Sequence, residues 1–302
     1  MTGGKSGRSR GLVVRWAACA LTVAVVSGCA SGGESDKPAG DGAADGAWAL
    51  PVEAYLPTRK EEQAITQARA ALVKDCMEAQ GFSYNQPPEL PEIGGQSLTD
   101  GRYGIWERDD VERWGYHPDP ERLKAHEEAT AQVTDLTQEL SQAERTALYG
   151  KSEGPAEGHG IGGCAREVSV KLGEGTTGES FTELAEAMAN DAHSRAQREP
   201  VVRKAFESWS ACMKKQGYDY QTPMDANDDA AFAEQEISDA ELAVALTDLD
   251  CREKHRVNQT WYEQETRWQK RLIEEKSVPL HAVRRQTADV VRKAQQVLEG
   301  SR

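Results

Sequence analysis

The sequence predicts a mostly α-helical protein, a disulfide-clamped helical bundle of two related units with a loop-rich aromatic insertion in the first unit. Three observations predict this fold class. Apolar residues recur at three- and four-residue steps, and no segment shows the sustained period-two alternation of a half-buried strand. A nine-residue motif occurs twice along the chain. Four of the six cysteines lie well beyond the N-terminal segment, and an even number favours disulfides.

The N-terminal segment has the layout of a secretory signal. Basic residues precede a largely apolar stretch from Trp16 to Val26, which is shorter than the roughly 20 residues that span a bilayer. Val26-Ser27-Gly28-Cys29 then matches a lipobox. We therefore expect residues 1–28 to be removed as a signal peptide. Cys29 would then carry acyl chains such as palmitate at the outer, extracytoplasmic face of the cell membrane. A plain secretory signal with a chance cysteine is the alternative.

The charge of the chain limits its partners. Removal of residues 1–28 would take away four basic residues and no acidic one, which changes the formal charge from −14 to −18. Such a chain is not expected to bind nucleic acid or anionic lipid headgroups through bulk electrostatics, so membrane attachment is expected from the acyl chains. Only four phenylalanines are present. We therefore expect thin helix–helix contacts that the oxidising compartment reinforces with disulfides.

Composition divides the rest of the chain into a tether and two units. Residues 29–47 are rich in Gly, Ala, Ser and Asp, which predicts a flexible tether. The 18 residues after Cys29 would span about 25 Å on average. Residues 48–178 form the predicted first helical unit with its insertion, and residues 179–302 form the second, which ends in long helices.

The first unit opens with an amphipathic helix. Thr58 and Glu61 match a capping box, and Gly81 is expected to end the helix. The predicted apolar stripe consists of Ile65, Ala68, Leu72, Cys76 and Ala79.

The nine-residue motif indicates an internal duplication. Cys76 to Tyr84 and Cys212 to Tyr220 both read Cys-Met-x-x-Gln-Gly-aromatic-x-Tyr, and each follows an amphipathic helix. Two ordinary glycine-capped helix ends are the alternative. The predicted face of the second helix consists of Val201, Ala205, Trp209, Cys212 and Gln216.

The four cysteines Cys76, Cys164, Cys212 and Cys251 allow three disulfide connectivities, and the sequence does not choose among them. The duplication favours a symmetrical hypothesis, which pairs Cys76 with Cys164 and Cys212 with Cys251. Each bridge would then clamp one helix to a partner helix and contribute about 4–5 kcal/mol in the chain-entropy model.

The insertion carries an aromatic cluster that is the best binding candidate in the sequence. Its members are Tyr103, Trp106, Trp114, Tyr116 and His117. Aromatic side chains of this kind line ligand grooves and anchor interfaces, whereas the alternative is that they form the core of the insertion. Further helices are expected from Asp119-Pro120 and from Ser141.

The C-terminal part is predicted to be almost continuously helical from Ala240, with Ser238 as a cap. Trp261, Glu265, Trp268 and Leu272 recur at helical spacing, and Val278-Pro279 is expected to break the run before a last helix that ends near Gly300.

The chain resembles a group of uncharacterised actinobacterial lipoproteins over most of its mature length. The residues that carry the resemblance are the lipobox, Tyr103-Gly104-Ile105, Gly115 to Pro118, Gly162 to Ala165, Ala211 to Met213 with Gly217-Tyr218, and Asp250 to Lys254. The resemblance implies a location in the cell envelope and no particular chemistry.

Motifs for catalysis or metal binding are weak. Gly150-Lys151-Ser152-Glu153-Gly154 imitates a nucleophile elbow and the end of a phosphate loop, yet a helix-like segment rather than a strand precedes it. Asp225, Asn227, Asp229 and Glu236 have EF-hand-like spacing, but Ala230 stands where glycine is needed, so calcium binding stays open with a solvated loop as the alternative. No histidine pair has zinc-ligand spacing, and we predict no catalytic residue, metal or cofactor.

The sequence therefore predicts a non-enzymatic binding, scaffold or accessory protein of the envelope. Its expected partners are the membrane, through the anchor on Cys29, and an envelope protein or cell-wall component. A cell-envelope hydrolase and a solute-capturing component of a transporter are the alternatives.

Overall fold

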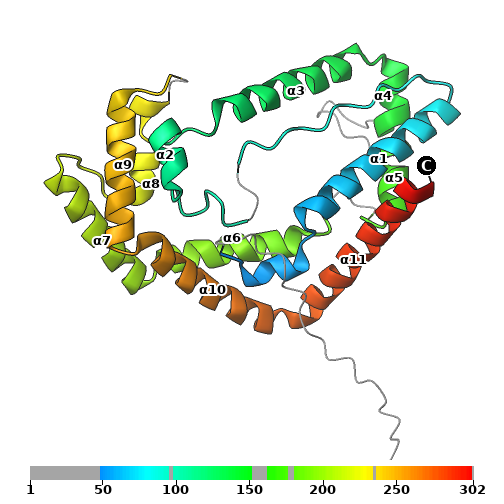
Figure 1. The fold of residues 1–302 in the computed structure, drawn as a ribbon. Coiled ribbons are helices and arrows are strands. Elements are labelled where there is room, and N and C mark those ends of the chain that lie inside the picture. The colour runs from blue at the N-terminus through cyan, green and yellow to red at the C-terminus, as the bar shows by residue number, and fades with distance from the viewer. Residues whose placement is uncertain (1–47, 95–97, 152–161, 176–179, 234–235, 301–302) are drawn as a thin grey trace, which may run out of the picture. The chain divides into compact units, whose positions relative to one another are not determined.

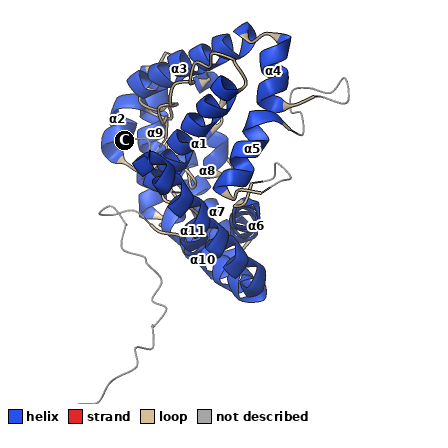
Figure 2. Cartoon of the chain, turned by 90° about the vertical axis from the view of Figure 1, so that its right-hand side faces the viewer, coloured by secondary structure: helices blue, strands red, loops and turns tan. Residues whose placement is uncertain are grey.

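Helices make up nearly all of the regular structure in the computed structural model, which describes residues 48–94, 98–151, 162–175, 180–233 and 236–300. Within these ranges no strand occurs (Figure 2), so the predicted fold class is confirmed. The predicted signal, Cys29 and the predicted tether lie outside the described residues. None of the described helices is long and apolar enough to cross a membrane.

Eleven α-helices and two short 3-10 helices follow one another along this part of the chain (Figure 1). In order they are η1 (Pro51–Tyr55), α1 (Arg59–Ala79), α2 (Arg108–Trp114), α3 (Pro120–Glu139), α4 (Gln142–Tyr149), α5 (Gly163–Leu172), α6 (Glu183–Gln197), α7 (Pro200–Lys215), α8 (Pro223–Asn227), η2 (Ala230–Phe232), α9 (Asp239–Lys254), α10 (Val257–Glu275) and α11 (Ser277–Gly300).

The predicted helix starts are confirmed at three serine and threonine caps. The side chains of Thr58, Ser141 and Ser238 each accept a hydrogen bond from the backbone N–H three residues later, which satisfies a donor left open at the helix N-terminus. Asp119 caps α3, whose first residue is the expected proline.

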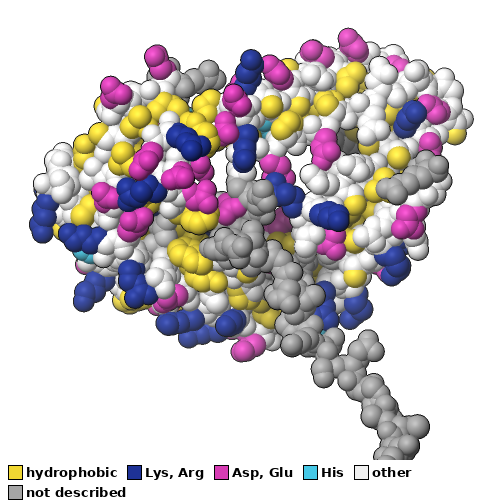
Figure 3. Space-filling model, viewed as in Figure 1, with side chains coloured by type: hydrophobic (Ala, Val, Ile, Leu, Met, Phe, Trp, Pro, Cys, Tyr) yellow, Lys and Arg dark blue, Asp and Glu magenta, His cyan; other side chains and the backbone are white. Residues whose placement is uncertain are grey.

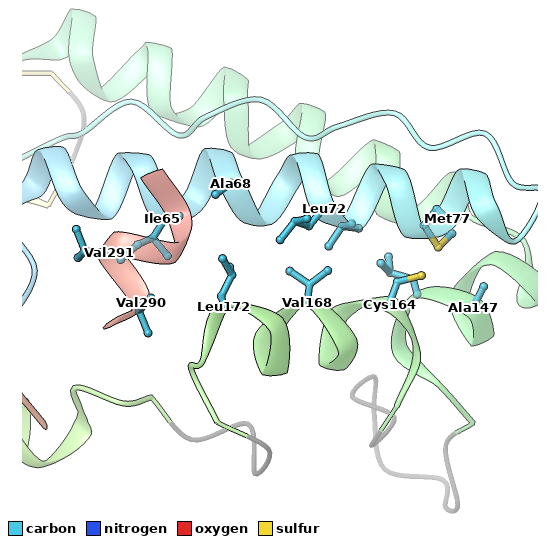
Figure 4. Packing of buried hydrophobic residues seen from close by; sticks show 13 residues of the cluster. Ile65, Ala68, Leu72, Met77, Ala147, Cys164, Val168, Leu172, Val290 and Val291 are labelled. Carbon is cyan, nitrogen blue, oxygen red and sulfur yellow. The ribbon is translucent and has the colours of Figure 1, made fainter. Parts of the chain in front are cut away.

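One hydrophobic core forms between α1, α4, α5 and α11. Leu72 and Met77 of α1 face Val168 and Cys164 of α5, and Val290 of α11 closes the far end (Figure 4). The buried side chains of this core are aliphatic or sulfur-containing. We call it the first core.

A second core forms around α6, α7, α9 and α10. Trp209 of α7 and Trp261 of α10 are buried there, and Phe206 meets the Trp261 ring edge-on at 5.2 Å. A neighbouring cluster joins η1 to α6, α10 and the start of α11. We use second core for the α6–α10 assembly.

The two cores do not follow the predicted boundary between residues 178 and 179. Helix α11, from the predicted second unit, packs along α1 and gives Val290, Val291 and Ala294 to the first core. In the opposite direction, Trp48 and Tyr103 pack into the second core. Each predicted unit therefore completes its hydrophobic interior with a segment from the other.

Both copies of the repeated motif end their helices in the same way. Gly81 and Gly217 have positive φ values of 85° and 96°, which favour glycine. The N–H of the following aromatic residue reaches back to the methionine carbonyl, at 3.0 Å from Phe82 and 3.1 Å from Tyr218. Both are Schellman-type helix ends, so the repeated sequence motif adopts the same local structure in both copies.

The sulfurs pair as the symmetrical hypothesis predicts. Cys76 and Cys164 join α1 to α5, and Cys212 and Cys251 join α7 to α9, with S–S distances of 2.02 and 2.07 Å.

Three sequence expectations need correction. The buried face of α1 contains Val73 and Met77 beside the predicted Ile65, Ala68 and Leu72, whereas Ala79 is exposed. The buried face of α7 consists of Val202, Phe206, Trp209 and Met213, whereas Val201 is 47% exposed, so the predicted face was wrong by about one position. The C-terminal helical run breaks at Lys276 rather than at Val278-Pro279, because proline is tolerated in the first turn of the next helix. A further break lies at Arg256, which adopts a left-handed conformation.

Candidate functional site

The predicted aromatic cluster lies mostly inside the protein, where it fastens the insertion to the second core. Tyr103 is 2% exposed, and its hydroxyl donates a 2.8 Å hydrogen bond to Glu265 of α10. Arg102 donates to the same carboxylate at 2.9 Å, and His193 Nδ1 of α6 lies 2.8 Å from it. One buried carboxylate therefore gathers three side chains from two distant segments.

The surroundings of Glu265 favour the ionised form of its carboxylate. Burial would raise the pKa of Glu265, but the hydrogen bonds from His193 and Arg102 outweigh burial and hold that pKa below its ordinary value. Burial and the adjacent carboxylate raise the pKa of Tyr103 well above its usual range, so this phenol stays protonated as a donor.

A second buried carboxylate, Asp248 of α9, holds Tyr116. Its oxygens accept hydrogen bonds from Trp209 Nε1 at 2.7 Å, Tyr116 Oη at 3.1 Å and Arg252 Nε at 2.7 Å. The Arg252 guanidinium then donates to the carbonyl oxygen of Tyr103 at 2.5 Å. Arg252 thereby links the two carboxylate clusters.

The three other members of the aromatic cluster are His117, which contacts a third buried carboxylate, Trp114, which is half-buried, and Trp106, which is exposed. His117 Nε2 lies 3.4 Å from buried Glu241, whose other oxygen accepts the Tyr116 N–H at 3.0 Å. Trp114 ends α2 and is half-buried beside Arg113. Trp106 is 42% exposed.

A small pocket borders Trp106, but its size excludes an organic ligand. It is lined by Trp48, Thr99, Asp100, Tyr103, Gly104, Trp106 and Asn258, and its volume is about 20 Å³. That space suits about one water molecule, whereas small-molecule sites measure some 300–1,000 Å³. The aromatic cluster therefore packs the insertion against α9 and α10, which is the structural alternative to a ligand groove.

A larger recess lies where the end of α6 and the start of α7 meet α10. This open groove has a volume of about 440 Å³ and is lined by Asp191, Arg195, Arg198, Glu199, Pro200 and Trp268. We call it the Trp268 groove. Sequence reasoning placed Trp268 on a helical stripe and did not identify the groove.

Cationic groups surround the indole ring of this groove. The guanidinium carbons of Arg195 and Arg271 lie 5.1 and 5.0 Å from the Trp268 ring centroid, within cation–π range. The indole N–H donates a 2.8 Å hydrogen bond to Glu199, which fixes the orientation of the ring. Arg198 is exposed at the groove.

The local charge differs from that of the whole chain. Residues 191–204 and 267–275 contain seven Lys or Arg and four acidic residues, one of which, Glu275, interacts with Arg195, in a chain with a formal charge of −14. Figure 3 shows dark-blue side chains gathered over α7 and α10. This charge clustering was the signal in the sequence that could have identified the groove, because guanidinium groups recognise phosphate and carboxylate.

The weaker motifs are explained by local structure. Asp225 belongs to the capping box of α8, and Asp229 accepts a 2.6 Å hydrogen bond from Tyr220 and caps η2. The described residues contain no cluster of three or more potential metal ligands. Gly150 follows helix α4 rather than a strand, whereas Ser152 and His159 lie outside the described residues.

No protein-family model, curated protein or solved structure matches this chain. The functional argument therefore depends on the chemistry of its own residues.

Proposed function

We propose that the protein is a membrane-anchored extracytoplasmic lipoprotein that acts as a non-enzymatic binding or accessory protein of the cell envelope. The lipobox Val26 to Cys29 supports the location. The Trp268 groove is the observation that carries the binding role, because it is an open recess edged by arginines, and guanidinium groups recognise anionic groups.

The two buried carboxylates support a structural rather than a catalytic role for the polar residues of the interior. Glu265 and Asp248 each accept hydrogen bonds from several side chains that hold segments together. A general base instead needs a substrate proton within about 2.6–3.2 Å, and the pocket nearest to Tyr103 admits only about one water molecule.

The location is tested by fractionation of cells that express the full chain with Cys29→Ser. Cys19→Ser is the matched control, because Cys19 lies in the predicted signal and upstream of the predicted cleavage. Membranes are washed with high salt, so that only a covalently anchored protein remains with them.

We expect the wild type and Cys19→Ser to stay in the washed membranes at the processed mass, and Cys29→Ser to be released or to accumulate unprocessed. Mass spectrometry of the N-terminal peptide should detect the acyl chains on Cys29. If Cys29→Ser remained in washed membranes at the processed mass, the anchored location would be wrong.

A further inference from the structure

We propose that the Trp268 groove and its basic surroundings form a face that docks the folded protein onto anionic phospholipid headgroups. The proposal rests on the proposed function only for the anchor that keeps the protein near a membrane. The face itself consists of the groove together with the exposed side chains Val201, Lys270 and Arg271.

Charge complementarity is the first argument. Of the two acidic residues in the groove, Asp191 pairs with Arg195 at 2.9 Å, whereas Glu199 accepts a hydrogen bond from the neutral Trp268 N–H and keeps its negative charge. Arg198 and Lys270 are exposed to solvent. An anionic surface attracts basic residues within a Debye length of it, while the acidic remainder of the chain is repelled and turned away.

The apolar groups of the face form the second argument. Val201 is 47% exposed at the start of α7, directly after the exposed Pro200. Trp268 is partly buried and its N–H already donates to Glu199, so it borders the face with the remaining part of its ring. Tryptophan side chains concentrate at the headgroup level of bilayers. An aliphatic group, an indole and several guanidiniums in one place suit a membrane interface better than bulk water.

The third observation concerns where the described part of the chain begins. Trp48, the first described residue, stacks on Tyr262 of α10 with ring centroids 5.0 Å apart. Tyr262 and Trp268 are six residues apart, which is about 9 Å along a helix. Residues 30 to 47, which lie outside the described part of the chain, separate Trp48 from Cys29. The described chain therefore begins against the same helix that carries Trp268.

Confinement by the anchor makes weak docking effective. A tethered site experiences a high effective concentration of its target, so modest affinity for headgroups suffices to orient the protein.

The test uses the chain from residue 29 onward with Cys29→Ser, which carries no acyl group. Its binding to phosphatidylcholine vesicles is compared with binding to vesicles of equal parts phosphatidylcholine and phosphatidylglycerol, by co-sedimentation over a salt series. The docking variant combines Arg198→Gln, Lys270→Gln and Arg271→Gln. The control variant combines Lys74→Gln, Arg122→Gln and Lys124→Gln, three exposed residues of α1 and α3.

Both variants lose the same total charge, so bulk electrostatics predicts equal effects. We expect binding only to the anionic vesicles, decreasing with salt. Each basic residue near an anionic surface contributes about 1 kcal/mol, so the docking variant should bind about 100-fold more weakly, and the control variant should bind within about twofold of the parent. Far-UV circular dichroism and urea midpoints verify that both variants fold.

A second pair of variants tests the apolar group. Val201→Glu and Val170→Glu replace valines of matched exposure, 47% and 49%, and glutamate in the first turn of α7 does not oppose the helix. Only Val201→Glu should weaken vesicle binding. The proposal is overturned by absence of binding to anionic vesicles, by equal binding to neutral ones, or by equal losses in docking and control variants. These vesicle results are independent of Cys29, so they separate failure of the face from failure of the anchor.

Discussion

The two copies of the repeated motif build the same helix end but meet very different interiors. Met77 and Met213 are both fully buried, and each neighbouring cysteine forms a disulfide. The buried side chains of the first core are all apolar, whereas α9 and α10 of the second core bury four charged residues, Glu241, Asp248, Arg252 and Glu265. The motif thus determines how a helix ends and what clamps it. The buried charges determine which additional segment the second core holds.

The largest expected effects come from removal of the disulfides. Paired Cys→Ser substitutions at Cys76 and Cys164 should cost about 4.5 kcal/mol, and those at Cys212 and Cys251 about 4 kcal/mol. The difference arises because the cysteines of the first pair are 88 residues apart and those of the second 39. Urea unfolding measures both values. A larger loss at the second pair would mean that its polar surroundings depend on the bridge.

The next effect separates the two cores directly. Asp248→Ala leaves Arg252 buried without its carboxylate, which should cost about 3–5 kcal/mol. Amide exchange should also accelerate at residues 98–117, because the Tyr116 contact is lost. Arg69→Gln is the matched control near the first core, where the ion pair with Glu174 is half-exposed and contributes about 1 kcal/mol or less. If Asp248→Ala and Arg69→Gln lowered the free energy of unfolding equally, the difference between the polar second core and the apolar first core would be contradicted.

The motif methionines test the similarity rather than the difference. Met77→Ala and Met213→Ala each open a cavity in a closed interior and should each cost about 2–5 kcal/mol. We expect the two losses to be of the same order, because both side chains are fully buried and each substitution removes the same atoms. Thermal or urea unfolding of the two variants, compared with Val170→Ala at an exposed site, measures them. A loss of stability in only one of the two variants would show that the two methionines are packed differently although their helix ends are alike.

The smallest expected effect is the dependence of stability on pH. The pKa of Glu265 is lower in the folded protein than in the unfolded chain, so its contribution is fully present above about pH 4.5 and decreases as the pH falls below that value. Glu265→Gln should therefore flatten the acid limb of a stability–pH curve. Glu167→Gln, at an exposed position of α5, is the charge-matched control. If the stability–pH curve of Glu265→Gln had the same acid slope as that of the wild type, the lowered pKa of Glu265 would be wrong.

The features that the sequence predicted are those that local chemistry determines. The caps at Thr58 and Ser141, the ends at Gly81 and Gly217, and the symmetrical disulfides follow from residues close together or repeated along the chain. The face of α7 was misplaced by about one position because Val201 and Val202 are equally apolar, and only tertiary packing distinguishes them.

The candidate site was less accessible to sequence reasoning, because its parts are distant in the chain. Tyr103 is separated by 162 residues from Glu265, so nothing local indicated that the aromatic cluster would be packed against α10. Trp268 meets Arg195 through the packing of α6 on α10, which periodicity alone does not predict. Local excess of arginine over acidic residues was the usable signal.

The exchange of segments between the cores has a consequence for biogenesis. Because synthesis proceeds from the N-terminus to the C-terminus, α1, α4 and α5 are made well before α11, which begins at Ser277. Until α11 is present, the side chains that Val290 and Ala294 cover stay exposed to solvent. The first core therefore cannot be completed before α11 is made, and a truncation before Ser277 would leave its earliest helices without that cover.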